Sequence, residues 1–235
     1  MVDVDGPIDL LVPLKWLDRA KSRLRDATGG DARSHVRLVL AMALDTLTAA
    51  RAAERVRRVV VITADPAVAE VVRAEGFDTV RDTPDAGLNA ALEHGAGMLR
   101  ALDPTAGVGA LQGDLPALRP DELDDALAAA PVGRSFCPDH QGSGTTLLLA
   151  GPGHPLDPRF GPGSARAHAA SGATPLLGPW PSLRCDVDLP ADLRRAADLG
   201  LGAHTRAFLD RAGGVPGEGT PGAGGGRAPG LTSGT

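Results

Sequence analysis

The sequence predicts a single α/β domain with a mostly parallel sheet and helices on both faces of that sheet. Two observations support this prediction. Short apolar segments alternate along the chain with longer segments whose apolar residues recur at helical spacing. Acidic residues also follow apolar segments at 111–118 and 183–190, and the carboxyl ends of parallel strands form the ligand-binding edge of such sheets. We therefore expect one domain over residues 1–212, with a ligand site at this edge.

The first part of the chain is expected to form strands and helices in alternation. In order, we expect a strand at 8–13, a helix at about 32–53, a strand at 56–63, a helix ending at Glu75, and a short strand at 77–81. The segment 56–63 (VRRVVVIT) gives the clearest signal, because it is rich in β-branched residues. Asp65-Pro66 directly after it is a helix start signal, which supports the helix that follows.

The second part continues the alternation, with a tight turn between two strands. We expect a loop and helix over 85–102, a strand at 107–111, a helix at 120–129, strands at 133–137 and 145–150, a helix from about 164, a strand ahead of Asp186, and a last helix at 190–199. From residue 213 to 235 the chain consists mainly of Gly, Pro, Ser, Thr and Ala. Such a segment cannot bury enough apolar surface to fold, so we expect a disordered tail.

Composition excludes several classes of function. Aromatic residues make up only 3% of the chain, Tyr is absent, and the formal net charge is −5. A base-stacking platform and a basic patch are therefore missing, and we expect no nucleic-acid partner. No apolar run approaches the length of a membrane span and the N-terminus lacks the basic start of a signal peptide, so we expect a soluble, cytoplasmic protein without a membrane partner.

The two cysteines, Cys137 and Cys185, do not have the spacing of metal ligands. A single disulfide between them is one interpretation. Two reduced thiols are the other, and they are favoured in a cytosolic protein.

The acidic motifs LQGDLPAL at 111–118 and LRCDVDLP at 183–190 carry the main functional hypothesis. Asp114, Asp186 and Asp188 could hold a divalent cation such as Mg²⁺ against phosphate groups if the fold brings the two motifs together. The structural alternative for Asp114 is a helix cap or turn. Asp188 could instead cap the helix that begins at Pro190, which leaves Asp186 as the stronger ligand of that pair.

Three basic residues follow the first expected strand, where phosphate-binding turns usually lie. Lys15, Lys21 and Arg23 could contact a triphosphate, although a solvated helix face would show the same charges. The segment lacks the glycines of a Walker loop or of a G-x-G-x-x-G turn, which disfavours kinases and dehydrogenases. Asn89, in GLNAAL, could read a purine edge or cap a helix, and the sequence favours neither.

The segment FGPGSARAH at 160–168 is a candidate anion site, because Gly161 and Gly163 allow close approach of the backbone and Ser164 begins a helix. A plain tight loop is the alternative. Thr145 and Thr146 stand at the start of an expected strand, where strand propensity alone could explain them. No arrangement typical of a Ser-His-Asp or reactive-cysteine site is present. An ionised phosphate or carboxylate nucleophile would need no general base, so this observation favours such an acceptor.

Together, VPLKWLDRAKSRL, GLNAAL, DLPAL, GSGTTLLL, FGPGSARAH and DVDLPADL closely resemble the guanylyltransferases of deazaflavin coenzyme F-420 biosynthesis, in particular the actinobacterial branch that uses phosphoenolpyruvate. The resemblance covers about residues 8–209, with the motifs in family order. It implies a Rossmann-like nucleotidyltransferase fold, shared with the molybdenum-cofactor guanylyltransferases. It also implies transfer of GMP from GTP to phosphoenolpyruvate with release of pyrophosphate, using Mg²⁺.

The resemblance further implies roles for individual residues. Thr146, Gly161 and Ser164 would bind phosphoenolpyruvate, while Asp114, Asp186 and Asp188 would hold Mg²⁺. GTP would be bound by Lys15, Lys21, Arg23 and Asn89. The product would pass to the next enzyme of the F-420 pathway, and a homodimer is left open. Trp16 departs from the family pattern, which has a small residue or proline at this position.

Three alternatives stay open from the sequence. The acceptor could be 2-phospho-L-lactate, which differs from phosphoenolpyruvate in the saturation of one carbon. A molybdopterin or sugar nucleotidyltransferase is disfavoured by the absence of a glycine-rich loop after the first strand. A nucleotide-binding domain without catalysis is disfavoured because all three aspartates are present.

Overall fold

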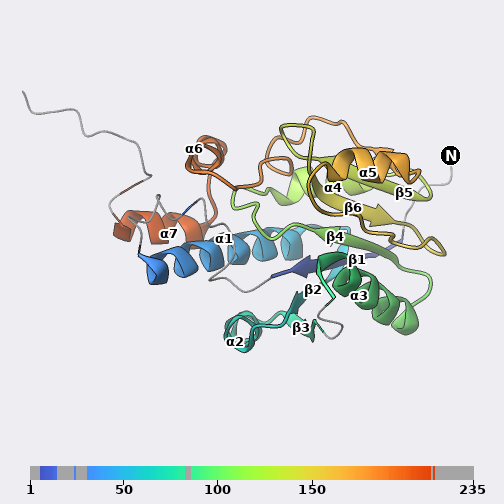
Figure 1. The fold of residues 1–235 in the computed structure, drawn as a ribbon, viewed down its shortest axis with the longest axis horizontal. Coiled ribbons are helices and arrows are strands. Elements are labelled where there is room, and N and C mark those ends of the chain that lie inside the picture. The colour runs from blue at the N-terminus through green and yellow to red at the C-terminus, as the bar shows by residue number, and fades with distance from the viewer. Residues whose placement is uncertain (1–5, 15–23, 25–30, 83–85, 213, 215–235) are drawn as a thin grey trace, which may run out of the picture.

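The computed structural model describes residues 6–14, 24, 31–82, 86–212 and 214 (Figure 1). Lys15, Lys21 and Arg23 of the expected phosphate-binding segment lie outside the described residues, as does the tail expected after residue 212, apart from Gly214. The strands are β1 (Ile8–Pro13), β2 (Val56–Thr63), β3 (Asp78–Arg81), β4 (Gly107–Leu111), β5 (Arg134–Pro138), β6 (Thr145–Ala150) and β7 (Thr174–Pro175). The helices are α1 (Ala32–Ala52), α2 (Pro66–Ala74), α3 (Leu88–Leu102), α4 (Pro120–Ala128), α5 (Ser164–Ala170), α6 (Pro190–Leu199) and α7 (Ala203–Ala212).

The described strands form one sheet in the order β3-β2-β1-β4-β6-β5-β7. All neighbouring pairs are parallel except β4–β6 and β5–β6, so β6 alone of these strands runs against the others. The N-terminal end of β6 therefore lies at the same edge of the sheet as the carboxyl ends of β1, β2 and β4. The expected mostly parallel sheet is confirmed.

Helices cover both faces of this sheet. On β1, Leu10 and Val12 belong to a core cluster with residues of α1, α2, α4, α6 and α7, whereas Leu11 belongs to a second cluster with residues of α3 and α5. Successive side chains of a strand point to opposite faces, so a buried strand needs apolar residues at every position. The run IDLLVP meets this requirement except at Asp9.

Asp9 is an exception because it forms an ion pair at the edge of the sheet opposite the carboxyl ends of β1, β2 and β4. Its side chain is buried, and Arg57 near the start of β2 donates to both of its carboxylate oxygens, over 2.9 and 2.7 Å. Arg57 also donates to Asp103, at the end of α3. The bidentate geometry is the strongest form of an arginine–carboxylate contact, and it stabilises the buried charge of Asp9.

The structure differs from the sequence expectation before the second acidic motif. No strand precedes Asp186: residues 181–184 form turns, and 185–187 adopt no regular structure. The backbone there bonds to two different neighbours, since the Val187 amide donates to the Asp114 carbonyl and the Arg184 carbonyl accepts from the His140 amide. Because the two bonds go to separate loops, no strand ladder forms.

Two elements were not expected from the sequence, β7 and α7. The strand β7 has two residues, which are too few to show the alternation of polar and apolar residues that predicts a strand. The helix α7 begins without a capping side chain of its own. Asp45 of α1 accepts hydrogen bonds from the amides of His204 and Thr205, both at 2.8 Å, and so satisfies the first turn of α7 from a distant part of the chain.

Both cysteines are free thiols and are buried. The interpretation as reduced thiols is confirmed, and the disulfide alternative is wrong. Burial raises the pKa of each thiol to about 11. Among the described helices, none combines the length and apolar character that crossing a bilayer requires.

Candidate functional site

The loop that carries Asp114 follows β4 and is held from three directions. The Gln112 amide donates to the carbonyl of Thr146 on β6 over 2.8 Å. The Leu115 amide donates to the buried hydroxyl of Thr46 on α1 over 2.9 Å, and the Pro116 carbonyl accepts from the Gly202 amide. These bonds fix the backbone on both sides of Asp114, so its carboxylate is presented at the carboxyl edge of the sheet by a rigid loop.

The second acidic motif lies directly against this loop. The amide of Val187 donates to the carbonyl of Asp114 over 3.0 Å, which places Asp186 and Asp188 on either side of a residue bonded to Asp114. The side chain of Asp186 is 21% exposed, while Asp188 is exposed. The fold therefore brings the two motifs together, which is the condition that the metal hypothesis from the sequence requires.

The segment before Asp186 is anchored on α4. Buried Glu122 accepts hydrogen bonds from both the amide and the hydroxyl of Ser182, each at 2.7 Å. The Ser182 hydroxyl in turn accepts from the Arg119 amide over 3.0 Å. A buried carboxylate is stabilised by such bonds, and here they hold the turn from which the second motif departs.

Asp188 does not cap α6, so that structural alternative is wrong. The N-cap residue is Leu189, and buried Asp192 within the first turn accepts from the amides of Asp188 and Leu189, at 3.2 and 2.8 Å. The capping role thus belongs to Asp192.

His140 is a residue of this site that the sequence did not single out. It follows β5, and its Nδ1 lies 3.8 Å from an oxygen of Asp186 while its Nε2 lies 3.9 Å from an oxygen of Asp192. The turn that carries it is fixed by Asp139, which accepts from the amides of Ser143 and Gly144. From the sequence, the motif DHQGSG indicates only an Asx-type turn. It does not indicate the role of His140, because Asp186 and Asp192 are more than 40 residues away in the chain.

No group of three or more His, Cys, Asp or Glu side chains within the described ranges is arranged to ligate a metal ion. Asp114, Asp186 and Asp188 thus do not form a preformed three-ligand cluster. Two carboxylates next to bound phosphates are nevertheless a donor set that Mg²⁺ accepts, since this ion usually keeps several waters and few protein ligands.

Thr145 and Thr146, at the start of β6, make different contacts. The hydroxyl of Thr146 donates to the carbonyl of Cys137 over 3.4 Å. The hydroxyl of Thr145 lies 2.9 Å from Nδ1 of His168 and 3.2 Å from the hydroxyl of Ser164. Ser164 is therefore in contact with Thr145, and Thr145 joins the set of residues at this site that the sequence analysis did not select.

The loop that precedes Ser164 is held by three side chains from three different elements. Asn89 of α3 pairs with the backbone of Phe160: its Oδ1 accepts from the Phe160 amide over 2.8 Å and its Nδ2 donates to the Phe160 carbonyl over 3.1 Å. Arg134 of β5 donates to the carbonyls of Leu156 and Asp157. His168 of α5 accepts from the Arg159 amide over 2.9 Å.

These bonds hold a loop with an unusual backbone. Asp157 has a φ of 45°, a left-handed value that is uncommon for residues other than glycine, and Gly161 and Gly163 have φ of 141° and 73°. Such conformations persist only where the surroundings fix them. We conclude that the FGPGS segment is a preorganised loop, and that the main contact of Asn89 is with this loop.

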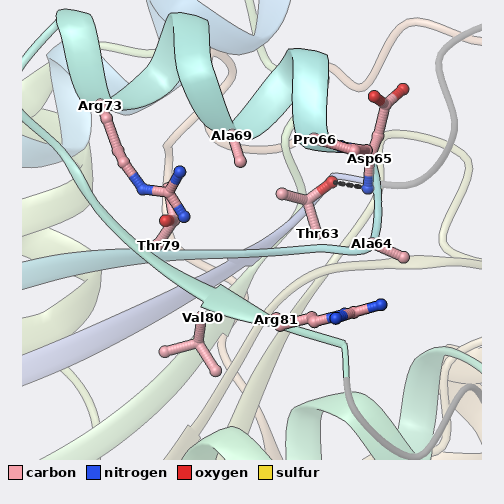
Figure 2. A pocket seen from close by; sticks show the side chains of 9 residues that line it. All are labelled: Thr63, Ala64, Asp65, Pro66, Ala69, Arg73, Thr79, Val80 and Arg81. Atoms are coloured by element: carbon pink, nitrogen blue, oxygen red, sulfur yellow. Dashed lines mark hydrogen bonds between the residues drawn. The ribbon is translucent and has the colours of Figure 1, made fainter.

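A separate cavity of about 250 Å³ lies at the ends of β2 and β3, beside α2. Figure 2 shows Thr63, Asp65, Arg73, Thr79 and Arg81 among its lining residues. None of the site residues expected from the sequence lines this cavity.

Comparison with known domains and structures gives the class of this protein. The MobA-like NTP transferase domain matches residues 35–178 of the chain. A solved nucleotidyl transferase from Methanothermobacter thermautotroptrophicus superposes with a TM-score of 0.53 at 17% identity, over 87% of this chain and 99% of that one. A solved 4-diphosphocytidyl-2C-methyl-D-erythritol synthase gives 0.55 at 15% identity, over 83% and 99%. The Rossmann-like nucleotidyltransferase fold is confirmed, and the protein is a nucleotidyltransferase.

Sequence relatives narrow the class further. The phosphoenolpyruvate guanylyltransferase of Geodermatophilus obscurus is 53% identical over 204 residues, which cover 85% of this chain and 93% of that protein. The phosphoenolpyruvate guanylyltransferase of Thermomonospora curvata is 50% identical over 211 residues, covering 89% and 91%. The chain belongs to the phosphoenolpyruvate guanylyltransferase family.

Proposed function

We propose that this enzyme transfers GMP from GTP to phosphoenolpyruvate, releasing pyrophosphate and forming enolpyruvyl-diphospho-guanosine for the next step of coenzyme F-420 biosynthesis. Identity of about 50% with phosphoenolpyruvate guanylyltransferases along most of the chain is the observation that carries the proposal. The geometry supports it, since the rigid Asp114 loop lies beside the second acidic motif through the Val187–Asp114 bond.

Asp114 and Asp186 are the residues we assign to a magnesium ion, with Asp188 as a third candidate. Their hard oxygen donors lie on adjacent segments at the carboxyl edge of the sheet, which fits an ion that binds one or two carboxylates together with substrate phosphates. When bound, Mg²⁺ would neutralise charge that develops on the phosphates of GTP.

We assign the acceptor to the hydroxyl cluster and loop around Ser164. Thr146, Gly161 and Ser164 would contact phosphoenolpyruvate, and the preorganised loop would place it in a fixed position relative to Asp114. Lys15, Lys21 and Arg23 would neutralise the triphosphate. Asn89 holds Phe160 with Oδ1 and one amide hydrogen, and its second amide hydrogen would contact the guanine.

The reaction as proposed does not need a protein base. The phosphate of phosphoenolpyruvate is ionised near neutral pH, so its oxygen can attack the α-phosphorus of GTP directly. Both ring nitrogens of His168 are occupied by hydrogen bonds, and burial lowers its pKa to about 4, which leaves no free lone pair for proton transfer. Catalysis would therefore rest on positioning and charge neutralisation.

The test is turnover by the purified protein with GTP and Mg²⁺, using phosphoenolpyruvate and 2-phospho-L-lactate in separate reactions. We expect GTP-dependent pyrophosphate release with phosphoenolpyruvate, and a product with the mass of its GMP adduct. Turnover with 2-phospho-L-lactate but not with phosphoenolpyruvate would change the assigned acceptor and leave the proposed guanylyl transfer intact. Pyrophosphate release with neither acceptor would refute the proposed function.

A further inference from the structure

His168 is completely buried and contacts two aromatic rings. Its ring centroid is 5.8 Å from that of Phe136 and 5.1 Å from that of Phe160, the latter in an edge-to-face arrangement. The other charged groups that affect it are Arg134, Arg159 and Asp157. Burial is the largest influence on the pKa of His168 and lowers it, so the ring is neutral and one of its nitrogens carries hydrogen at neutral pH.

The backbone decides which nitrogen that is. The amide of Arg159 can only donate, and it points at Nε2 of His168 over 2.9 Å, so Nε2 must hold a lone pair. In a neutral ring the hydrogen then lies on Nδ1, which donates to the Thr145 hydroxyl over 2.9 Å. The tautomer of His168 is therefore fixed by a loop amide, and Thr145 is fixed as its acceptor.

The hydrogen bond from His168 to Thr145 also affects the hydroxyl of Ser164. Ser164 lies 3.2 Å from Thr145 and donates to it when no other acceptor is present. Hydroxyl hydrogens rotate, so if an anion accepts the hydrogen of Ser164, Thr145 can turn its own hydrogen toward the Ser164 oxygen. The Nδ1–H of His168 supports this reversal, because Thr145 still receives one hydrogen bond after giving its own.

We propose that His168 is a positioning residue that, through Thr145, prepares the Ser164 hydroxyl to donate to an anionic group of the acceptor. The proposal rests on the proposed function, in which Ser164 contacts phosphoenolpyruvate. In this proposal a series of hydrogen-bonded groups holds one hydrogen-bond donor in place for a phosphate or carboxylate. The groups are the Arg159 amide, His168, Thr145 and Ser164.

The hydrogen bonds that lead from His168 through Thr145 to Ser164 form a relay. Two amide substitutions distinguish a role in this relay from simple support of the loop. In His168→Asn the side-chain amide can replace Nδ1 and donate to Thr145, but it does not reach Arg159. In His168→Gln the amide can replace Nε2 and accept from Arg159. If the relay sets acceptor binding, His168→Asn should keep the KM for phosphoenolpyruvate within about threefold, whereas His168→Gln should raise it about tenfold, the loss expected for one hydrogen bond to a charged group. The KM for GTP should change in neither. The reverse order would overturn the relay.

Thr145→Val provides a second test if both histidine variants fold poorly. It removes one hydroxyl from the relay while keeping the side-chain shape. We expect about a tenfold rise in the KM for phosphoenolpyruvate with an unchanged KM for GTP. Ser171→Ala is the matched control, because its hydroxyl donates to the His168 carbonyl over 2.8 Å but takes no part in the relay. An unchanged KM in Thr145→Val, or an equal rise in Ser171→Ala, would refute the proposal.

A measurement that does not depend on turnover distinguishes failure of this proposal from failure of the proposed function. Nitrogen NMR of ¹⁵N-histidine-labelled full-length protein reports the tautomer of each ring. We expect one resonance pair, assigned by its loss in His168→Asn, to show the Nδ1–H tautomer without titration from pH 8 to 5.5. An Nε2–H tautomer or a charged ring would overturn the relay even in an active enzyme. If the enzyme uses 2-phospho-L-lactate instead, the same KM comparison applies to that acceptor.

Discussion

The amide of Val187 donates to the carbonyl of Asp114 over 3.0 Å, joining two acidic motifs that are more than 70 residues apart in the chain. The bond is between backbones, so it uses none of the carboxylate oxygens of the two motifs. The Asp114 loop is held by Thr46 and the Val187 segment by Glu122 through Ser182. The relative position of the two motifs is thus set by buried hydrogen bonds to α1 and α4.

Asp114→Asn should abolish transfer while preserving the fold. The substitution keeps the shape of the side chain but removes the charge assigned to Mg²⁺, and we expect kcat to fall by at least about 100-fold. Pyrophosphate release measures the loss, and urea unfolding checks stability. Asp125→Asn on the exposed surface of α4 is the control and should remain fully active. Normal activity in Asp114→Asn would contradict the metal assignment.

Thr46→Val should weaken both stability and activity although the residue lies on α1. The variant leaves the buried Leu115 amide without its acceptor, which costs about 1–3 kcal/mol of unfolding free energy. Because Leu115 follows Asp114, the loop should shift and kcat should fall with it. Urea unfolding and steady-state kinetics measure the two effects. A loss of stability with an unchanged kcat would show that Thr46 supports only the fold.

Asp9→Asn should destabilise the enzyme without changing its kinetics. It removes a buried carboxylate that receives two hydrogen bonds from Arg57, a contact of the class worth about 1.5–3 kcal/mol. The pair lies at the edge of the sheet opposite the site, so the KM values and kcat should be unaffected. A lower urea midpoint with wild-type kinetics is the expected result, and altered kinetics would contradict the separation of the two edges.

The stability of the enzyme should fall on acidification partly because of His168. Burial lowers the pKa of this ring to about 4, whereas in the unfolded chain it is about 6.5, so between these values the unfolded state binds a proton that the native state does not. Unfolding free energy is therefore lost as the pH falls from about 6.5 to 4. Urea unfolding from pH 7.5 to 4.5 should show a shallower loss in His168→Asn than in the wild type. Parallel curves would contradict the lowered pKa.

Cys137 and Cys185 should be unreactive in the folded enzyme. Both are at most 1% exposed, and burial raises the pKa of each thiol to about 11, so the reactive thiolate is scarce at pH 8. With Ellman's reagent we expect almost no reaction in native buffer and two thiols per chain in guanidinium chloride. Fast labelling of a native thiol would indicate local opening.

Most helices and strands were predictable because their signals are local. The segment VRRVVVIT and the Asp65-Pro66 start signal define β2 and α2 within a few residues, and Asp65 does cap α2 through the amides of Ala67 and Val68. The helix α7 was missed because its cap, Asp45, belongs to α1. The prediction of a strand before Asp186 was wrong. The apolar residues there are buried, but they lie in turns anchored on Glu122 and do not pair in the sheet.

The candidate site was likewise predictable only in part. The sequence by itself determined the fold class, the family and the chemical types at the site, because these follow from local periodicity and from motifs such as DLPAL and FGPGS. Only the tertiary structure decided that Asp192 caps α6, that Asn89 holds Phe160, and that Thr145 is the hydroxyl in contact with Ser164. Each of these depends on a hydrogen bond, whose short range and strict direction can be known only once the fold has placed both partners.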